Sequence, residues 1–488
     1  MYSTVREWRH APPPEAIADA VAEEPGVVLF LGGWPTVQQA RFSLFARRPF
    51  LTVQIWGSRL ELIRYDLPGE RIGVEVSYGN PWSWLHGLWA RFELRQEPDL
   101  PFPLGGMFGF WGYDLNRFLE PTVLPRAARD LGLPDAWIGF YDSVVCWDHA
   151  LGKTWIVATG LCPDGTISPW RARLHVEAWE QLGEKCRAQP SRSRDGAWGG
   201  CLRTSLPREA FLQRVQRALA YIRQGHIYQV NLSQRLSVCG QGSAWPVFRR
   251  LREICPAPGS AWLNAGSFQL LSASPELFLQ ISGAHVVTRP IKGTRPRGGD
   301  PESDARLAEE LLASPKENAE LVMITDLLRN DLGRICEYGS VRVRELARVE
   351  SHPRVHHLVS TVEGRLRCGC SHLEALAAMF PGGSVTGAPK VRAMQIIEEL
   401  EPVQRGFFTG TLGYLGFNRE SRLHMMIRTA CRIGRWMHHP VGAGIVADSD
   451  PEAEYEETLA KAKGWWEALQ QSGSSRVAQP VLAASLSS

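Results

Sequence analysis

The sequence predicts a globular protein in which both strands and helices are abundant. The chain has 488 residues, of which 44% are hydrophobic and 22% charged, so it can bury one very large core or two ordinary ones. Strand-like runs broken by Gly and Pro fill residues 1–200, and helix signals with Gly-rich turns dominate residues 204–469. We therefore expect two regions with this boundary, followed by a disordered tail at 472–488.

Composition excludes several classes of protein. Lys and Arg total 54 against 51 Asp and Glu, a net charge of +3, so no basic field points to nucleic acid. No run reaches the roughly 18 apolar residues of a membrane span, and the N-terminal residues lack a secretory pattern. The ten cysteines are scattered, and only one pair is close, in CGC (368–370), which is too little for a zinc site. We expect a soluble cytoplasmic protein with free thiols and no membrane or nucleic-acid partner.

The first 200 residues contain the clearest strand candidates. They are VVLFL (27–31), LTVQIW (51–56) and DSVVCW (142–147). In PLGGMFGFWGYDLNRFLE (103–120), glycines alternate with large aromatic residues, which is typical of strands that approach closely around bulky side chains. The polar stretch at 186–200 is predicted to be a linker or surface loop.

A first helix is predicted over residues 314–334. Ser314 is a natural N-cap, Pro315 fits the first helical position, and Glu317 completes an S-x-x-E capping box. The apolar stripe consists of Leu321, Ile324, Leu327 and Leu328.

A second helix is predicted over residues 450–469, with Asp450 as its cap and Pro451 next. Each of the two helices carries two glutamates three residues apart, on one face: Glu317 with Glu320, and Glu454 with Glu457. Spacing alone favours first-turn acids stabilised by the helix dipole. The alternative is a Mg²⁺ site between facing helices, and spacing does not show whether the helices face each other.

A Gly-rich segment, FPGGSVTGAPKVRAM (380–394), precedes a further helix signal. Gly382 and Gly387 have the separation of a phosphate loop, but Ala388 stands where that loop has Lys, and no Ser or Thr follows Lys390. The segment is therefore not expected to bind a nucleotide. Its backbone amides could still bind a carboxylate.

Three further segments contain candidate catalytic side chains. Lys292 lies in an apolar run before a Gly turn; it is either a surface charge or, if held out of water, a nucleophile or base. Glu276 has apolar neighbours in SASPELFL (272–279), which would raise its pKa toward that of a general acid. Of the adjacent His356 and His357, only one can face a site from a strand.

Seven segments occur in a characteristic order along the chain. They are IYQVNLSQRL (227–236), SASPELFL, RPIKGTRPRG (289–298), DLLRNDLGR (326–334), HHLVSTVEG (356–364), PGGSVTGAPKVRAMQIIEELEP (381–402) and GAGIVADSDPEAEYEETLAKA (442–462). Together they resemble one family, the chorismate-utilising enzymes, which comprises anthranilate synthase component I, aminodeoxychorismate synthase component I, and the isochorismate and salicylate synthases. The resemblance is strong over residues 204–469 and weaker in the N-terminal GGMFGFWGYDL stretch.

The resemblance implies a fold and a site. The fold would be α+β, a large two-sheet antiparallel β sandwich flanked by helices, to which the N-terminal third also contributes strands. Glu320 and Glu457 match Mg²⁺ ligands, assisted by Glu317 and Glu454; the ion would orient the ring carboxylate of chorismate. The DLLRND residues are expected to be structural. The positions that match chorismate contacts are Gly293, Thr294, Tyr414, Arg428, Gly442, Ala443, Gly444 and Lys461.

Two positions distinguish the branches of the family. Isochorismate and salicylate synthases have Lys where this chain has Gln229, which argues against those branches. Anthranilate synthases usually read PIAGT where this chain reads PIKGT. Lys292 resembles the aminodeoxychorismate branch, in which the lysine attacks C2 of chorismate while an acid matched by Glu276 assists departure of the C4 hydroxyl. His357 matches a histidine that assists aromatisation in the anthranilate branch, so its role here is open.

The resemblance also implies partners. No cysteine lies in the Gly-flanked elbow of a class I glutaminase, so ammonia would come from a separate glutaminase subunit in a heterodimer. The alternatives are anthranilate synthesis and a catalytically silent chorismate-binding partner. Relatives that bind tryptophan use an LLxS-like segment and an aromatic stretch after Pro-x-Pro. This chain has VVLFLGGW (27–34) and PAPGSAW (256–262) there, so tryptophan binding stays open.

Overall fold

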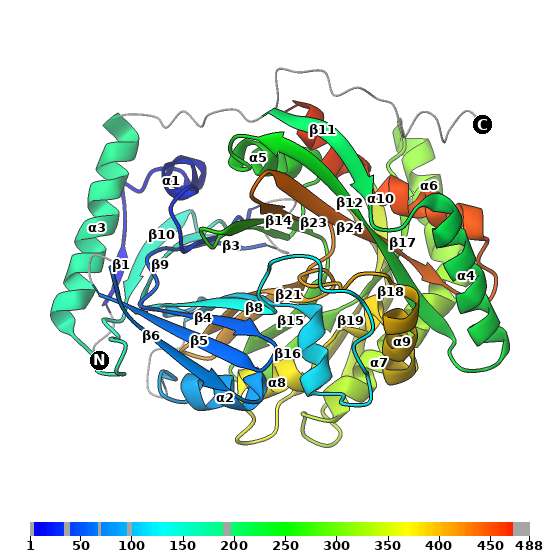
Figure 1. Ribbon diagram of the computed structural model, residues 1–488. Helices are drawn as coiled ribbons and strands as arrows, with labels where there is room; N and C mark the ends of the chain where they lie inside the picture. Colours follow the sequence, from blue (N-terminus) through cyan, green and yellow to red (C-terminus); the bar gives the residue numbers. More distant parts are fainter. Residues whose placement is uncertain (1–3, 34–39, 67–69, 95–99, 189–196, 472–488) are drawn as a thin grey trace.

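Two large antiparallel sheets form the body of the protein (Figure 1). A computed structural model describes residues 4–33, 40–66, 70–94, 100–188 and 197–471. The predicted tail at 472–488 and most of the predicted linker lie outside the described residues. No helix within these ranges is both long and apolar enough to cross a bilayer.

The first sheet has twelve strands. In spatial order they are β1 (Thr4–Glu7), β10 (Lys153–Ala158), β9 (Ser143–Asp148), β3 (Phe42–Ala46), β2 (Val27–Phe30), β13 (Gly259–Asn264), β14 (Phe268–Ser274), β23 (Thr429–Ile433), β24 (Trp436–Ile445), β12 (Gln229–Gln241) and β11 (Ala197–Thr204), with β20 (Gly387–Ala388) paired to β12.

The second sheet also has twelve strands. In spatial order they are β17 (Ile291–Pro296), β19 (Val355–Arg365), β16 (His285–Arg289), β15 (Leu277–Ser282), β22 (Glu420–Met425), β21 (Thr411–Gly416), β7 (Gly106–Trp111), β8 (Ala136–Tyr141), β4 (Leu51–Trp56), β5 (Arg59–Tyr65) and β6 (Arg71–Tyr78), with β18 (Arg342–Ser351) paired to β19.

Both sheets combine strands from the two sides of the predicted boundary, as the resemblance implied. The strands predicted at 27–31, 51–56 and 142–147 form β2, β4 and β9. Glycine-rich β7 pairs with β8 on one side and β21 on the other. A Cβ on Gly109 would lie 2.1 Å from the carbonyl oxygen of Trp137, so this close approach of strands requires glycine.

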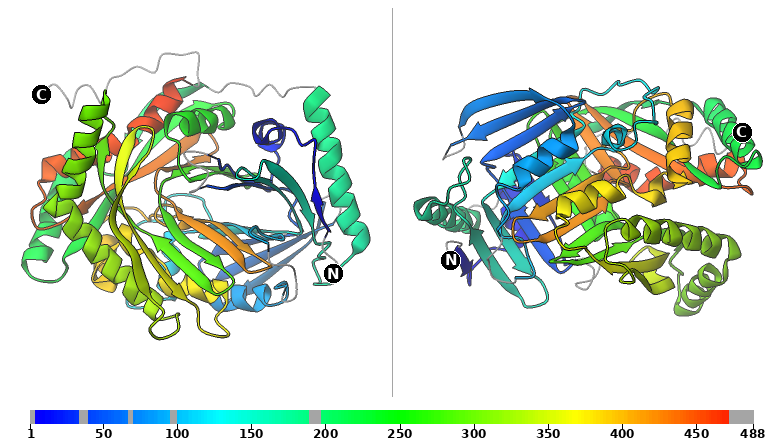
Figure 2. Two further views of the ribbon diagram at one scale, coloured as in Figure 1. Left: turned by 180° about the vertical axis from the view of Figure 1, so that it is seen from behind. Right: turned by 90° about the horizontal axis from the view of Figure 1, so that it is seen from below.

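The core fills the space between the sheets. One apolar cluster joins Phe30 and Leu44 of the first sheet to Phe108 and Phe110 of the second. Figure 2 shows the helices on the outside of the sheets. The helices are α1 (Pro14–Val21), α2 (Pro81–Trp89), α3 (Pro169–Ala188), α4 (Arg208–Arg223), α5 (Trp245–Ile254), α6 (Pro301–Ala313), α7 (Pro315–Gly333), α8 (His372–Met379), α9 (Lys390–Leu400) and α10 (Pro451–Gln471).

The two predicted helices are confirmed as α7 and α10. The Ser314 hydroxyl accepts a hydrogen bond from the backbone N–H of Glu317, and Asp450 accepts one from that of Ala453. The predicted capping box at Ser314 is wrong in its second half. The backbone N–H of Ser314 donates to the carbonyl of Leu311 at the end of α6, and the Glu317 carboxylate pairs with Arg295 on β17 instead.

Candidate active site

The ends of the two sheets meet beside α7 and α10, where β12, β24 and β17 lie close together (Figure 1). Lys292 on β17 extends its Nζ to within 3.6 Å of the Glu320 carboxylate on α7. A Cβ on Gly444 of β24 would lie 3.6 Å from this Nζ and 2.6 Å from Nε2 of Gln229 on β12. Lys292, Glu320, Gly444 and Gln229 therefore surround one point.

Gln229 has an unusual environment within this group. Its side chain is fully buried, and neither its amide oxygen nor its amide nitrogen has a hydrogen-bond partner among the described residues. Burying an amide without partners is costly. A polar ligand beside Lys292 would supply the missing partners.

Glu276 is buried and lies within range of the positive charge of Lys292. Burial raises its pKa from 4.5 to about 7, against the opposing effects of a hydrogen bond with the Ser384 side chain and the positive charge of Lys292. The raised pKa expected from its apolar neighbours is therefore confirmed. A carboxyl group with this pKa is protonated in part near neutrality and can act as a general acid.

His357 on β19 contacts the strand that carries Lys292. Its Nδ1 lies 3.0 Å from the hydroxyl of Thr294. Burial and the charge of Arg428 lower its pKa to about 3, so the imidazole is neutral at physiological pH. His356 points elsewhere and pairs with Asp304, which confirms that only one of the two histidines faces the site.

Arg428 supplies a positive charge near His357. Burial lowers the pKa of its guanidinium, and the Cys255 thiol is the one group in the described structure found to oppose this effect. None of the described carboxylates pairs with Arg428. A half-buried guanidinium without a carboxylate partner is suited to bind a carboxylate group of a ligand.

Successive residues of strand β24 face opposite sides of the sheet, and this holds for Gly442, Ala443 and Gly444. Lys461 on α10 donates a hydrogen bond to the carbonyl of Gly442 at 2.8 Å and pairs with Glu457 at 2.6 Å. The Ala443 side chain points the other way, into an apolar cluster with Leu232. A ligand on the face of β24 that Gly442 and Gly444 occupy can therefore contact only the backbone of Ala443.

The four glutamates predicted to bind Mg²⁺ lie in two pairs, on α7 and α10. Burial raises the pKa of Glu454, and the positive charge of Lys316 at the start of α7 opposes that rise, so the starts of the two helices are near each other. One Glu454 oxygen is buried without a hydrogen-bond partner in the described structure. The other carboxylate contacts are Glu317 with Arg295, Glu320 with Lys292, Glu454 with Ser449, and Glu457 with Lys461.

The four glutamates offer carboxylate oxygens, which are the donors that a hard cation such as Mg²⁺ prefers. Across the described ranges, no three His, Cys, Asp or Glu side chains are arranged to hold a metal ion. Mg²⁺, however, is commonly bound through one or two carboxylates, with water and substrate completing its shell. The unpaired Glu454 oxygen and the all-oxygen donor set fit that mode of binding.

Tyr414 is not among the side chains that gather around Lys292. Its ring stacks on Phe108 with centroids 5.3 Å apart and meets Phe30 edge-on. These contacts place Tyr414 in the apolar cluster between the sheets. The structure therefore gives no geometric support for the expected contact between Tyr414 and chorismate.

Ser384 is a further residue of the site, and no motif in the sequence singles it out. Its side chain hydrogen-bonds the Glu276 carboxyl, and it lies in the Gly-rich segment at 380–394 that resembles a phosphate loop in part. That segment is anchored by Lys390, whose Nζ lies 2.6 Å from Asp331 of the DLLRND motif. Ser384 thus serves a carboxyl group of the protein itself, and Asp331 pairs with a lysine of the same segment.

Comparison with known proteins identifies the class. Residues 60–466 match the family model described as chorismate binding enzyme. The chain belongs to this family, and it is a chorismate-utilising enzyme.

Individual relatives carry two different names. The chain is 42% identical to anthranilate synthase component 1 of Thermus thermophilus, covering 92% of this chain and 94% of that protein. It is 39% identical to aminodeoxychorismate synthase component 1 of Klebsiella aerogenes, covering 90% and 93%. The crystal structure of anthranilate synthase component I from Streptococcus pneumoniae superposes with a TM-score of 0.75 at 30% identity, covering 94% and 98%. The names of relatives do not distinguish between the two activities.

Proposed function

We propose that this chain converts chorismate and ammonia to 4-amino-4-deoxychorismate, the activity of aminodeoxychorismate synthase component I. The observation that supports this proposal most directly is the position of Lys292. Its amine lies 3.6 Å from the Glu320 carboxylate and close to the backbone of Gly444, and its positive charge acts on the protonatable Glu276. An amine in such a position can act as a nucleophile toward a ligand in the same space.

The proposed reaction uses the chain's own residues in two displacements. Lys292 leaves Glu320, releases its proton to solvent and attacks C2 of chorismate with its neutral amine. Both ring double bonds shift toward C4, and the C4 hydroxyl departs as water with the proton of Glu276. Ammonia then adds at C4 and expels the lysine, which gives 4-amino-4-deoxychorismate and free Lys292.

Other residues would bind and orient the substrate. Arg428 would pair with a carboxylate of chorismate, and the Gly442–Gly444 backbone would allow close approach of an anion. The hydroxyl of Thr294 would contact the substrate while His357 holds it in position. Glu320 and Glu457, assisted by Glu317 and Glu454, would hold Mg²⁺, which supplies charge neutralisation for the ring carboxylate when bound.

The ammonia would come from a separate class I glutaminase subunit that forms a heterodimer with this chain. Folate synthesis is the pathway served by 4-amino-4-deoxychorismate, once a lyase has released 4-aminobenzoate from it.

A product assay tests the proposal. The purified chain is incubated with chorismate, Mg²⁺ and an ammonium salt at mildly alkaline pH, and the products are analysed by mass and fluorescence. We expect aminodeoxychorismate, converted to 4-aminobenzoate only when a lyase is added. Anthranilate with pyruvate would refute the proposal and assign the chain to tryptophan synthesis. No product, even with a glutaminase subunit added, would favour the silent chorismate-binding partner.

A further inference from the structure

Two cysteine sulfurs lie in contact at one end of the first sheet, away from Lys292. Cys201 on β11 and Cys239 on β12 have their Sγ atoms 3.1 Å apart. The pairing of these strands is irregular between Trp198 and Leu202, and this irregularity allows the backbone N–H of Cys201 to donate to Cys239 Sγ at 3.0 Å. Within the described ranges, no other two cysteine sulfurs are in hydrogen-bonding contact.

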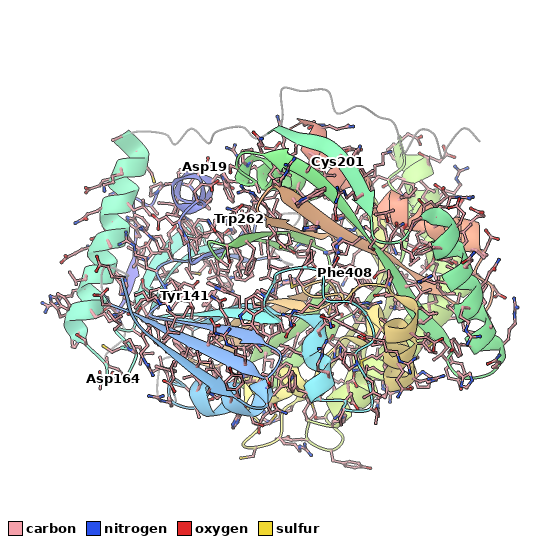
Figure 3. The ribbon with its side chains drawn as sticks, in the orientation of Figure 1. Asp19, Tyr141, Asp164, Cys201, Trp262 and Phe408 are labelled. Carbon is pink, nitrogen blue, oxygen red and sulfur yellow. The ribbon has the colours of Figure 1, made fainter. Side chains whose placement is uncertain are left out.

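The two thiols differ in accessibility. Cys201 is exposed and Cys239 is buried. Figure 3 shows Cys201 on the strand at the upper edge of the molecule. A reagent in solution therefore reaches Cys201 first, and Cys239 is the group that can react with Cys201 afterwards.

The surroundings of Cys239 favour its thiolate. Hydrogen bonds from the Cys201 thiol and backbone N–H lower the pKa of Cys239, and Arg435 adds a hydrogen bond and a positive charge. Burial acts against this effect at Cys239 but is outweighed by the hydrogen bonds, whereas at Cys146 and Cys431 burial prevails and raises the pKa. Because the thiolate is the reactive form of cysteine, Cys239 is set apart from the other buried cysteines.

We propose that Cys201 and Cys239 are a reversible redox modification site, which closes to a disulfide in the presence of a small organic disulfide. The Cys201 thiol loses its proton to solvent, and its sulfur attacks one sulfur of the oxidant, breaks the S–S bond and releases one thiolate, which takes up a proton. The Cys239 thiolate then attacks Cys201 Sγ and releases the second thiolate. Two protein thiols are oxidised and one disulfide is reduced to two thiols, so atoms and electrons balance.

The bond would fasten β11 to its neighbour without entering the candidate active site. On β12, Cys239 pairs with Trp436 at one end of β24, whereas Asn231 pairs with Gly444 near the other end. Oxidation should therefore slow amide exchange on β11 and leave the turnover of chorismate unchanged.

The test uses the full-length chain, fully reduced and then exposed to oxidised glutathione. We expect loss of two of the ten thiols, a mass decrease of two hydrogens, and a cross-linked peptide pair containing Cys201 and Cys239 after digestion. Dithiothreitol should restore both thiols. The matched control is Cys368→Ser, which removes another exposed thiol and should leave the cross-link intact.

Two variants make the inference refutable. Cys201→Ser changes an exposed side chain and should abolish the cross-link while the protein stays folded. Cys239→Ser should leave glutathione attached to Cys201, because the second displacement is removed. A wild-type chain that keeps all ten thiols, that retains glutathione on Cys201, or that forms its disulfide between other cysteines would overturn the proposal.

Discussion

Replacing Glu276 by Gln tests both the stability and the chemistry of the candidate site. Burial raises the pKa of Glu276 from 4.5 to about 7, so the folded protein keeps a proton that the unfolded chain loses. As pH rises from 4.5 to about 7, wild-type stability should fall by about 1.4 kcal/mol per unit, about 3 kcal/mol in total. The contribution is fully present below pH 4.5 and is lost above pH 7.

Glu276→Gln carries an uncharged amide at every pH. The variant should therefore lack this pH dependence and should exceed wild type in stability by up to about 3 kcal/mol at pH 8. Its kcat should fall by roughly 10² to 10⁴-fold, since it has no proton to donate. The assays are urea denaturation at pH 5 to 8 and turnover of chorismate. Glu302→Gln, at an exposed glutamate on α6, is the control and should leave both profiles as in wild type.

Two results would refute this reasoning. If Glu276→Gln and wild type lose stability in parallel between pH 5 and 8, Glu276 does not carry the buried proton. If wild-type kcat rises steadily through pH 8 and the variant retains it, Glu276 is not the acid.

Three further substitutions test other parts of the site. Lys292→Ala should abolish formation of aminodeoxychorismate, and a rate equal to wild type by product analysis would remove the lysine from the mechanism. Glu457→Gln should raise the Mg²⁺ concentration needed for half-maximal activity, because it deletes an anionic oxygen; Glu456→Gln is the neighbouring control, and equal metal titrations for the two would contradict the assignment. Gln229→Lys should let water compete with ammonia, and a product mixture free of isochorismate would count against the role given to this position.

Local sequence signals predicted the parts of the fold that depend on neighbouring residues. The Ser314–Pro315 start of α7 is specified within one helical turn, and the two adjacent histidines necessarily face opposite sides of a strand. The second half of the predicted capping box is wrong because Glu317 has a partner that is distant in the sequence. Arg295, on a strand about twenty residues earlier, competes for the Glu317 carboxylate.

The assembly of the candidate site could not be predicted from spacing. The charge of Lys316 on α7 acts on Glu454 on α10, although well over a hundred residues separate them in the chain. The Ser384 side chain reaches Glu276 over a similar separation. The resemblance to a family suggested that α7 and α10 approach each other, but nothing in the sequence suggested the contact of Ser384 with Glu276 or the packing of Tyr414 between the sheets.

The position of the Lys292 amine depends on the local backbone as well as on the identity of the side chain. The pairing of β17 with β19 is irregular between Lys292 and Thr294, and Gly293 between them has φ of 70°, as in a bulge that requires glycine. A Cβ on Gly293 would lie 3.0 Å from the Glu317 carboxylate and 2.8 Å from Leu311. The same bulge thus brings β17 against α7, directs Lys292 to Glu320 and leaves Thr294 in contact with His357. A lysine on a regular strand at this position would lack that arrangement. The glycine and the lysine of the PIKGT segment are therefore both needed to place the amine beside Glu320.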